Sequence, residues 1–518
     1  MQGARARTGW RAEVCATLEL LEGEIEDLFV RGLSAANADD VRTLDHAARQ
    51  LDGAGASFVA ARIDDVIVLQ KAGAKTAAKA LLQLQTTLRV FERVLTLEAV
   101  EALLGVANDD DVDAHARTAV APATTAGKPA AALLPSAEGK RLLPVLEDLA
   151  RAVEDLVATG LVTASKATKE KLEASFKEAS RLKLGRLAAS LRYVMEELGR
   201  YLDGAPTFSA KRLALFLGRS WMLGRGLALA ISEKNEAAQA RLLWSFPAVA
   251  VDSVVFVALG VRKRLPQGTG IVAFDFHLRV VDYIALPGGI TLARGAPLVW
   301  SHIVPRKDAS IPAEALLHLE IKPAGGGIGW KPVSLTDPKV FAVDVASVVV
   351  DGRGGGRLLM GPQTRVRALE RTVAPADLAG LAGFVPADIA DRAAAWQTSP
   401  LDLEVEHAEE VLVQAVVGKV KKGEEGAPDV VVVSAAAVGG ATFAFDVKLP
   451  RTEEWTALAT ALRALAKTKK TAPIFGVLHF DRCQLCFAPL SVVDDSGVRH
   501  LMISTDKVDL KTLTRSLF

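Results

Sequence analysis

Zinc binding is the first chemistry that this sequence suggests, through one histidine and two cysteines near the C-terminus. They follow the spacing His479-x3-Cys483-x2-Cys486, with His500 as a distant fourth candidate. Imidazole and thiolate groups are ligands that zinc prefers. However, Asp481-Arg482 is typical of a hairpin turn, which places Cys483 and Cys486 three apart on one strand and on opposite faces. The sequence therefore predicts two cysteines packed in a sheet and no bound metal.

Two histidines could instead support acid–base catalysis. His277 alternates with large apolar residues in the segment IVAFDFHLRVV, and His318 does so in a segment with Leu317, Leu319 and Ile321, which we predict to be a strand. If the two strands are neighbours, the histidines could share one site. The alternative is that both belong to the solvated face of a sheet.

Two glycine-rich segments, residues 325–329 and 352–357, could cradle a phosphate, with Arg353 and Arg357 supplying charge. Neither contains GxxxxGK[ST] or lies between a strand and a helix, so we expect both to be hairpin turns. No GxSxG motif occurs either. The sequence thus predicts no catalytic residue and no cofactor, and an enzyme with a site on the β region stays open as an alternative.

Nucleic-acid binding is another alternative, through three short basic clusters. They have no interleaved aromatic residues for base stacking, and two of them close predicted helices, where cations are favoured for dipole reasons alone. With 62 basic and 61 acidic residues, the chain has no overall field that would attract a polyanion. The candidate residues are Arg262, Lys263, Arg264, Lys421, Lys422, Lys469 and Lys470.

The N-terminal half, which must position any partner surface, contains an internal repeat. At an offset of 128 residues, ten positions of one segment carry the same residue as ten of another. Helical spacing of apolar residues runs through both segments. The sequence therefore predicts two superposable copies of one helical unit, residues 11–104 and 140–246. The matched residues are Glu26, Asp27, Leu28, Gly32, Leu33, Ala36, Leu44, Ala60, Ala61 and Val66 with Glu154, Asp155, Leu156, Gly160, Leu161, Ala164, Leu172, Ala188, Ala189 and Val194.

Near residue 246 the apolar period changes from 3.6 to 2, which indicates strands. We predict a multidomain α+β protein, with a duplicated N-terminal helical bundle, an antiparallel β domain and a C-terminal α+β domain. A helix is expected over residues 400–420. The expected boundaries are 1–105 for helical repeat 1, 106–138 for a flexible linker, 139–246 for helical repeat 2, 247–370 for the β domain, 371–425 for a helical connector and 426–518 for the C-terminal domain.

The cellular compartment is predicted from three negative features. Three cysteines are too few for a disulfide framework, which fits a reducing compartment. No apolar run follows the basic N-terminus as in a secretory signal. No apolar run approaches the roughly 20 residues of a membrane helix. We expect a cytoplasmic protein without membrane contact.

One resemblance adds to this picture. The repeated pattern D-L-[VF]-x-x-G-L, then Leu187–Arg192 and Leu213–Leu223, is similar to the helical region of bacterial SWIM zinc-finger-associated proteins, and the segments 473–476 and 488–492 are similar to their C-terminal part. Such proteins occur with a MoxR-type AAA+ ATPase and von Willebrand A-domain proteins. The SWIM finger itself needs CxC and CxH, which this sequence lacks. The resemblance therefore implies an accessory subunit without that zinc site.

From these features we expect a non-catalytic interaction or scaffold subunit of a bacterial multiprotein assembly. Its helical repeats would bind a protein partner, such as an AAA+ ATPase or a von Willebrand A-domain protein. The alternatives are a nucleic-acid-binding protein and an enzyme, as described above.

Overall fold

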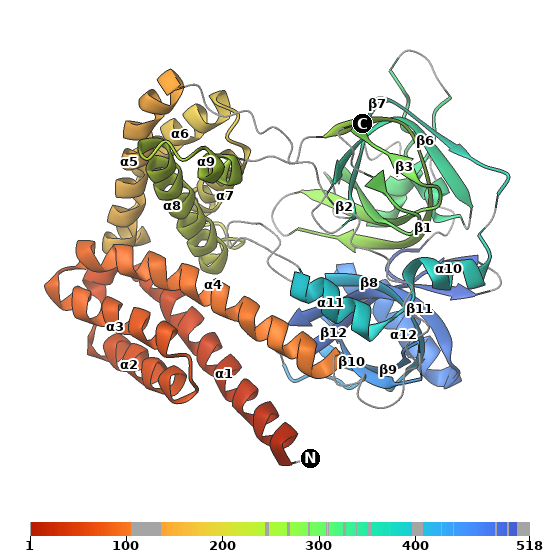
Figure 1. Ribbon diagram of the computed structural model, residues 1–518, viewed down its shortest axis with the longest axis horizontal. Helices are drawn as coiled ribbons and strands as arrows, with labels where there is room; N and C mark the ends of the chain where they lie inside the picture. The colour runs from red at the N-terminus through yellow and green to blue at the C-terminus, as the bar shows by residue number, and fades with distance from the viewer. Residues whose placement is uncertain are drawn as a thin grey trace. The chain divides into compact units, whose positions relative to one another are not determined.

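The computed structural model describes residues 2–104, 136–243, 248–395 and 408–504, with short gaps at 267–269, 288–290, 307, 309, 325–327, 338, 351–353, 372, 426, 439, 482–483 and 495–496. The described chain divides into two compact units (Figure 1). We call residues 2–96 and 136–243 the helical unit, and residues 97–104, 248–395 and 408–504 the barrel unit. The predicted multidomain α+β fold class is confirmed.

The helical unit uses one order of elements twice: a long helix, a short 3-10 turn and three further helices. The first copy consists of α1 (Gln2–Arg31), η1 (Leu33–Ala35), α2 (Ala38–Gly53), α3 (Ser57–Ala72) and α4 (Ala74–Leu104). The second consists of α5 (Ser136–Thr159), η3 (Leu161–Thr163), α6 (Lys166–Arg181), α7 (Gly185–Leu202) and α8 (Ala210–Ser232), followed by the short α9 (Glu236–Leu242). The predicted duplication is confirmed in this shared order.

The same local signals end and begin the helices of both copies. Gly32 follows α1 with φ 85°, and Gly160 follows α5 with φ 81°. Five residues further on, Asn37 and Ser165 cap α2 and α6, each in a reciprocal capping box. Equivalent positions in the repeat thus have equivalent backbone roles.

The two copies meet at these two glycines. A Cβ added to Gly32 would lie 2.4 Å from the backbone nitrogen of Gly160, and one added to Gly160 would lie 2.4 Å from the carbonyl carbon of Arg31. No larger residue fits at either position without moving the backbone. The positive φ of both glycines also disfavours any residue with a side chain. The matched glycines therefore fix how closely the copies approach each other.

One described helix, α8, is long and apolar enough to cross a membrane by length and composition. In the helical unit, 61% of its most apolar window is buried, as expected for the core helix of a bundle.

The barrel unit begins with a closed five-stranded barrel. Its neighbours are β1-β2-β5-β7-β6, and β5 pairs with β7 in parallel while the other pairs are antiparallel. Two 3-10 turns connect β5 to β6. The strands are β1 (Val249–Arg264), β2 (Ile271–Val280), β5 (Pro297–Pro305), β6 (Val340–Val350) and β7 (Gly356–Ala368), the turns are η5 (Ala313–His318) and η6 (Pro332–Thr336), and a small hairpin contains β3 (Ile284–Ala285) and β4 (Thr291–Leu292).

A second curved sheet follows two short helices, α10 (Pro375–Ala382) and α11 (Pro386–Ala395). Its order is β10-β9-β8-β11-β12-β13, and one parallel bridge, Asp446 opposite Cys486, joins β10 to β12 so that the sheet closes on itself. The elements are β8 (Ala408–Val417), β9 (Asp429–Ala436), β10 (Thr442–Leu449), η7 (Glu453–Trp455), α12 (Thr456–Thr468), β11 (Ala472–Asp481), β12 (Gln484–Asp494) and β13 (Gly497–His500).

Both barrels have the same topology. In chain order, their five main strands neighbour one another as first, second, third, fifth and fourth, and the third and fifth strands run parallel. This arrangement is that of the OB fold, a five-stranded Greek-key barrel. The sequence predicted a β domain and an α+β domain but not that they share one topology.

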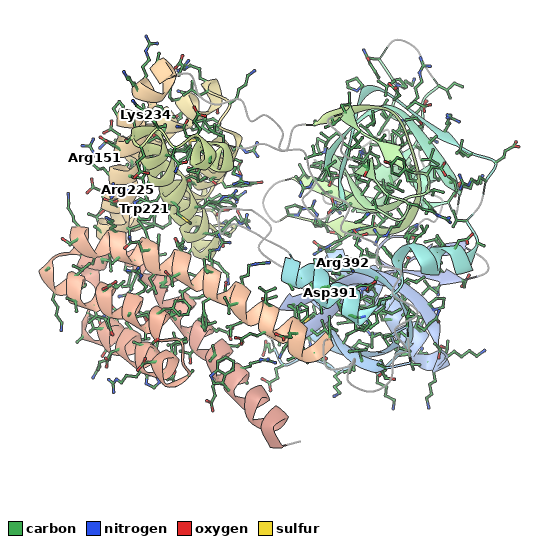
Figure 2. All side chains as sticks on the ribbon, in the orientation of Figure 1. Arg151, Trp221, Arg225, Lys234, Asp391 and Arg392 are labelled. Atoms are coloured by element: carbon green, nitrogen blue, oxygen red, sulfur yellow. The ribbon has the colours of Figure 1, made fainter. Side chains whose placement is uncertain are left out.

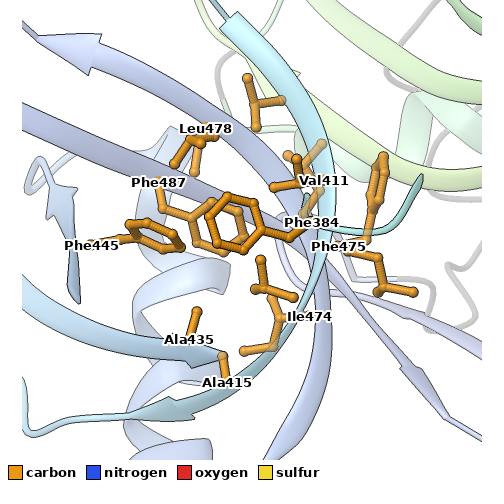
Figure 3. Close-up of a cluster of buried hydrophobic side chains, with 14 of the residues drawn as sticks. Phe384, Val411, Ala415, Ala435, Phe445, Ile474, Phe475, Leu478 and Phe487 are labelled. Atoms are coloured by element: carbon orange, nitrogen blue, oxygen red, sulfur yellow. The ribbon is translucent and has the colours of Figure 1, made fainter. Parts of the chain in front are cut away.

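Aromatic side chains fill the second barrel. Phe445 of β10 and Phe487 of β12 lie with their ring centroids 5.6 Å apart, and Figure 3 shows them inside the curved strands. Phe384, from the connection between α10 and α11, meets Phe445 edge-on at 5.6 Å. The connector therefore contributes to the core that it precedes, a packing that removes large aromatic surfaces from water.

Two sequence predictions of secondary structure are wrong. Residues 408–417 of the expected helix form β8, because Val411, Val413, Ala415 and Val417 alternate into the core and are each at most 5% exposed. The expected strand around Leu317 is the 3-10 turn η5, which follows Pro312. The expected linker lies outside the described residues except for residues 136–138, which begin α5.

The glycine contact makes a testable prediction about stability. Replacing Gly32 by Ala should lower the free energy of unfolding by about 2 to 4 kcal/mol. The loss is expected because alanine disfavours positive φ and because its Cβ would clash with the backbone of the second copy. Urea unfolding followed by circular dichroism measures this. Gly55→Ala is the matched control, because Gly55 has φ 84° but nothing within 4 Å of its added Cβ. Equal losses for the two variants would contradict the close contact.

Candidate functional site

The candidate zinc ligands His479, Cys486 and His500 do not form a metal site in the described residues. His479 of β11 lies opposite Cys486 of β12, while Cys483 lies outside the described residues. His500 is on β13, where its Nε2 lies 3.3 Å from the carbonyl oxygen of Thr336 and burial lowers its pKa to about 4. Over the ranges that the structure describes, no three His, Cys, Asp or Glu side chains are grouped to hold a metal ion.

The first basic cluster is built into the first barrel and is not a free patch. The Nζ of Lys263 lies 2.6 Å from Glu314 Oε1, and the Lys263 side chain is only 3% exposed. Arg264 donates through Nη2 to Asp275 Oδ1 at 2.9 Å. Arg262 precedes them on the same strand and is partly buried. Lys263 is thus buried in an ion pair, whereas Arg264 is paired with a buried acid while its own side chain is 41% exposed.

The structure describes both glycine-rich segments only in part. Residues 352 and 353 lie outside the described residues, and Gly356 and Arg357 begin β7, the antiparallel neighbour of β6. Residues 325–329 lie between Ile321 and Trp330, which form an isolated antiparallel bridge. Arg357 is an exposed residue of β7, and Arg353 lies outside the described residues.

The structure brings His277 to an unexpected neighbour. Its Nδ1 lies 2.7 Å from Oε1 of Glu410 on β8, the first strand of the second barrel. The other carboxylate oxygen of Glu410 accepts from Arg279, which also donates to the Glu410 carbonyl oxygen at 3.0 Å and lies over the ring of Phe475 at 5.5 Å. These three side chains, which we call the Glu410 cluster, join the polar face of β2 to the second barrel.

Burial and charge act in opposite directions on the Glu410 cluster. The side chains of Arg279, His277 and Glu410 are only 4%, 10% and 13% exposed. Burial raises the pKa of Glu410, but the positive charge of Arg279 and the contact with His277 prevail and hold it at about 2. The carboxylate is therefore ionised at neutral pH and compensates the buried guanidinium.

The geometry of the Glu410 cluster fits a structural role, in which it links the two barrels, better than a catalytic role. A carboxylate can orient an imidazole for proton transfer, but the free Nε2 of His277 is itself buried and makes no hydrogen bond. His318, the expected partner, is on η5 and not on a neighbouring strand. The predicted solvated face is also wrong, because Asp275, His277 and Arg279 are each at most 9% exposed. Sequence reasoning missed Glu410. The signal that could have found it is an acidic residue in a segment rich in β-branched residues.

The helical unit also contains a polar contact between an aromatic ring and charged side chains. Trp221 of α8 donates its indole N–H to Glu154 Oε1 of α5 at 2.7 Å, and Arg225 lies over the Trp221 ring at 5.8 Å (Figure 2). This contact ties the first and last helices of the second copy together.

The remaining basic residues are exposed and lie at loops of the second barrel. Lys421 and Lys422 lie in the connection between β8 and β9, and Lys469 and Lys470 follow α12. The β8–β9 connection is anchored at Gly423, whose backbone N–H donates to Asp429 and whose carbonyl accepts from Arg451 at 2.8 Å. Next to this anchor, a pocket of about 230 Å³ opens at the start of α12.

No protein-family model and no curated protein matches the chain. Among solved structures, a chain of a replication protein A heterotrimer bound to ssDNA aligns with 52% of this chain and 68% of its own length, at 10% identity and a TM-score of 0.14. A TM-score this low does not establish a common fold. The function is therefore argued from the residues.

The Glu410 cluster predicts a pH-dependent stability. Replacing Glu410 by Gln should cost about 3 to 5 kcal/mol at pH 7, because Arg279 stays buried without its counter-charge. The folded pKa of about 2 lies below the ordinary 4.5, so this contribution is complete above about pH 4.5 and is lost as the pH falls towards 2. Chemical unfolding at pH 7 and pH 3 should show the difference between wild type and E410Q shrinking.

Glu409→Gln is the control for this experiment. Glu409 is the preceding residue and pairs with the half-exposed Arg392 at 3.0 Å, so its loss should cost less than about 1 kcal/mol. A difference between wild type and E410Q that stays constant with pH would contradict the ionised, paired carboxylate.

Proposed function

We propose that this protein is a non-catalytic scaffold subunit whose helical unit binds a protein partner. The observation that carries this proposal is the contact of Gly32 with Gly160, which holds two like helical copies in one fixed body. The internal pairing of Lys263, Arg264 and Glu410 supports it further, since these charges serve the fold. The proposed location is the bacterial cytoplasm, and no cofactor is required.

The first copy offers a surface for such a partner. Phe58 of α3 is 49% exposed and its ring meets Phe91 of α4 edge-on at 5.5 Å. Val90 and Val94 of α4 are 43% and 41% exposed. Grouped exposed apolar side chains are typical of protein interaction surfaces. By the resemblance described above, the proposed partner is an AAA+ ATPase or a von Willebrand A-domain protein.

The scaffold proposal predicts a specific loss of binding. Full-length protein carrying Phe58→Asp and Val94→Asp should no longer retain the partner in an affinity capture from cells of the source organism, because two charges would be buried in the interface. Quantitative mass spectrometry of the captured proteins measures this.

Ile328→Asp is the control, since Ile328 is an apolar residue of the barrel unit that is 95% exposed. The partner should be recovered with wild type and with this control. Recovery of the same partner with the double variant would overturn the proposed surface.

Nucleic-acid binding is the second candidate function, and one observation favours it. The loop that joins the first and second strands is one of the places where OB-type barrels bind oligonucleotides. In the second barrel this loop carries Lys419, Lys421 and Lys422, all of them exposed. Lysines in such a loop can neutralise backbone phosphates without base-specific contacts.

This candidate predicts a salt-dependent affinity. Lys421→Glu with Lys422→Glu should weaken binding of a fluorescein-labelled 15-nucleotide oligo-dT roughly 10-fold or more, and should reduce the slope of log K against log salt by about 1.4 for two lost phosphate contacts. Fluorescence anisotropy between 50 and 200 mM salt measures both quantities.

Lys469→Glu with Lys470→Glu makes the same charge change at the end of α12 and should change little. If wild type does not bind the oligonucleotide, or if both double variants weaken binding equally, the lysine loop is not a specific site.

A further inference from the structure

The pocket at the start of α12 has a composition that the scaffold proposal does not use. It lies in the second barrel where the beginning of β9, the end of β10 and the first turn of α12 meet. Its volume is about 230 Å³, less than the 300 to 1,000 Å³ of a site that encloses a whole small molecule. The residues around it are Asp429, Leu449, Pro450, Arg451, Thr452, Trp455, Thr456, Ala459 and Arg463.

Two arginines in this pocket share one carboxylate. Arg451 donates from Nε and Nη2 to Asp429 Oδ1, at 3.0 and 2.8 Å, and Arg463 donates from Nη2 to Asp429 Oδ2 at 3.3 Å. Asp429 is only 8% exposed, and its contact with Arg451 lowers its pKa. One carboxylate therefore holds both guanidinium groups, and the three side chains together carry one excess positive charge.

The arginines keep donors for a second anion. A guanidinium has five N–H groups, and the side chains of Arg451 and Arg463 are 42% and 52% exposed. Guanidinium groups suit phosphate oxygens because they can donate two parallel hydrogen bonds. Trp455 lines the same pocket and offers an aromatic ring beside the charge.

We propose that this pocket binds a backbone phosphate of single-stranded nucleic acid. The lysine loop continues the site, because Arg451 donates to the Gly423 carbonyl oxygen at 2.8 Å and so holds the backbone of the loop beside the pocket. The five basic residues of the loop and pocket outnumber the three acids, Glu424, Glu425 and Asp429. The pocket has room for one phosphate and part of the adjoining nucleotide. This size suits a nucleic-acid strand that passes across the pocket and stacks one base on Trp455.

This inference rests on the second candidate function, and the experiment separates the two. Arg463→Gln removes one guanidinium but leaves Asp429 paired with Arg451, so the fold is retained. Arg392→Gln is the control, since Arg392 of α11, labelled in Figure 2, is similarly exposed, at 49%, and pairs with Glu409 of β8. Labelled oligo-dT is titrated against full-length wild type and both variants, and inorganic phosphate and a serine-phosphorylated peptide are tested as competitors.

We expect Arg463→Gln to weaken oligo-dT binding roughly 5- to 10-fold and to lower the salt slope by about 0.7, while Arg392→Gln changes neither. Inorganic phosphate at millimolar concentration should compete with wild type and not with Arg463→Gln. If the loop variants weaken binding but Arg463→Gln does not, the loop binds nucleic acid and the pocket assignment is wrong. If no oligonucleotide binds, both fail, and binding of the phosphopeptide alone would also overturn the inference.

Discussion

The ion pair between Glu410 and Arg279 is the interaction on which the barrel unit depends. A guanidinium that is 4% exposed and a carboxylate that is 13% exposed would each cost several kcal/mol to bury alone. Together with His277 they satisfy one another across the junction of the two barrels. Because a buried charge without a partner is so unfavourable, this pairing allows few relative positions of β2 and β8.

The same junction determines which surfaces of the barrels are available for binding. On an isolated OB-type barrel, the outer face of the second and third strands is where ligands bind. In the first barrel, the second strand presents Asp275, His277 and Arg279 on that face, and all three are buried. In the first barrel, His277 and Arg279 on this face instead contact Glu410 of the second barrel. In the second barrel, Val432 and Ser434 on the corresponding strand offer no aromatic ring, so its charged loop and pocket are the more distinctive features.

Sequence reasoning succeeded where a local signal decides the structure. Gly32 and Gly160 match at one offset in the sequence, and both end a helix with positive φ. This conformation could be predicted because glycine adopts it without steric cost. Sequence reasoning failed where packing between residues far apart in the sequence determines the structure. The β8 segment has apolar residues at both helical and strand spacing, and its burial between neighbouring strands selects the strand. The Glu410 cluster could not be predicted, because its members are 133 residues apart and only the closed barrels bring them together.

The basic residues show how position in the fold separates structural from functional charge. In the sequence, Lys263 lies between two other basic residues, and Lys421 also has a basic neighbour. In the structure, Lys263 lies on a strand and is paired with Glu314, because that face of the strand is covered. Lys421 lies in a connection, where water can solvate it and no internal acid is needed. At the loop and the pocket of the second barrel, Lys421, Lys422, Arg451 and Arg463 therefore present positive charge that solvent can reach.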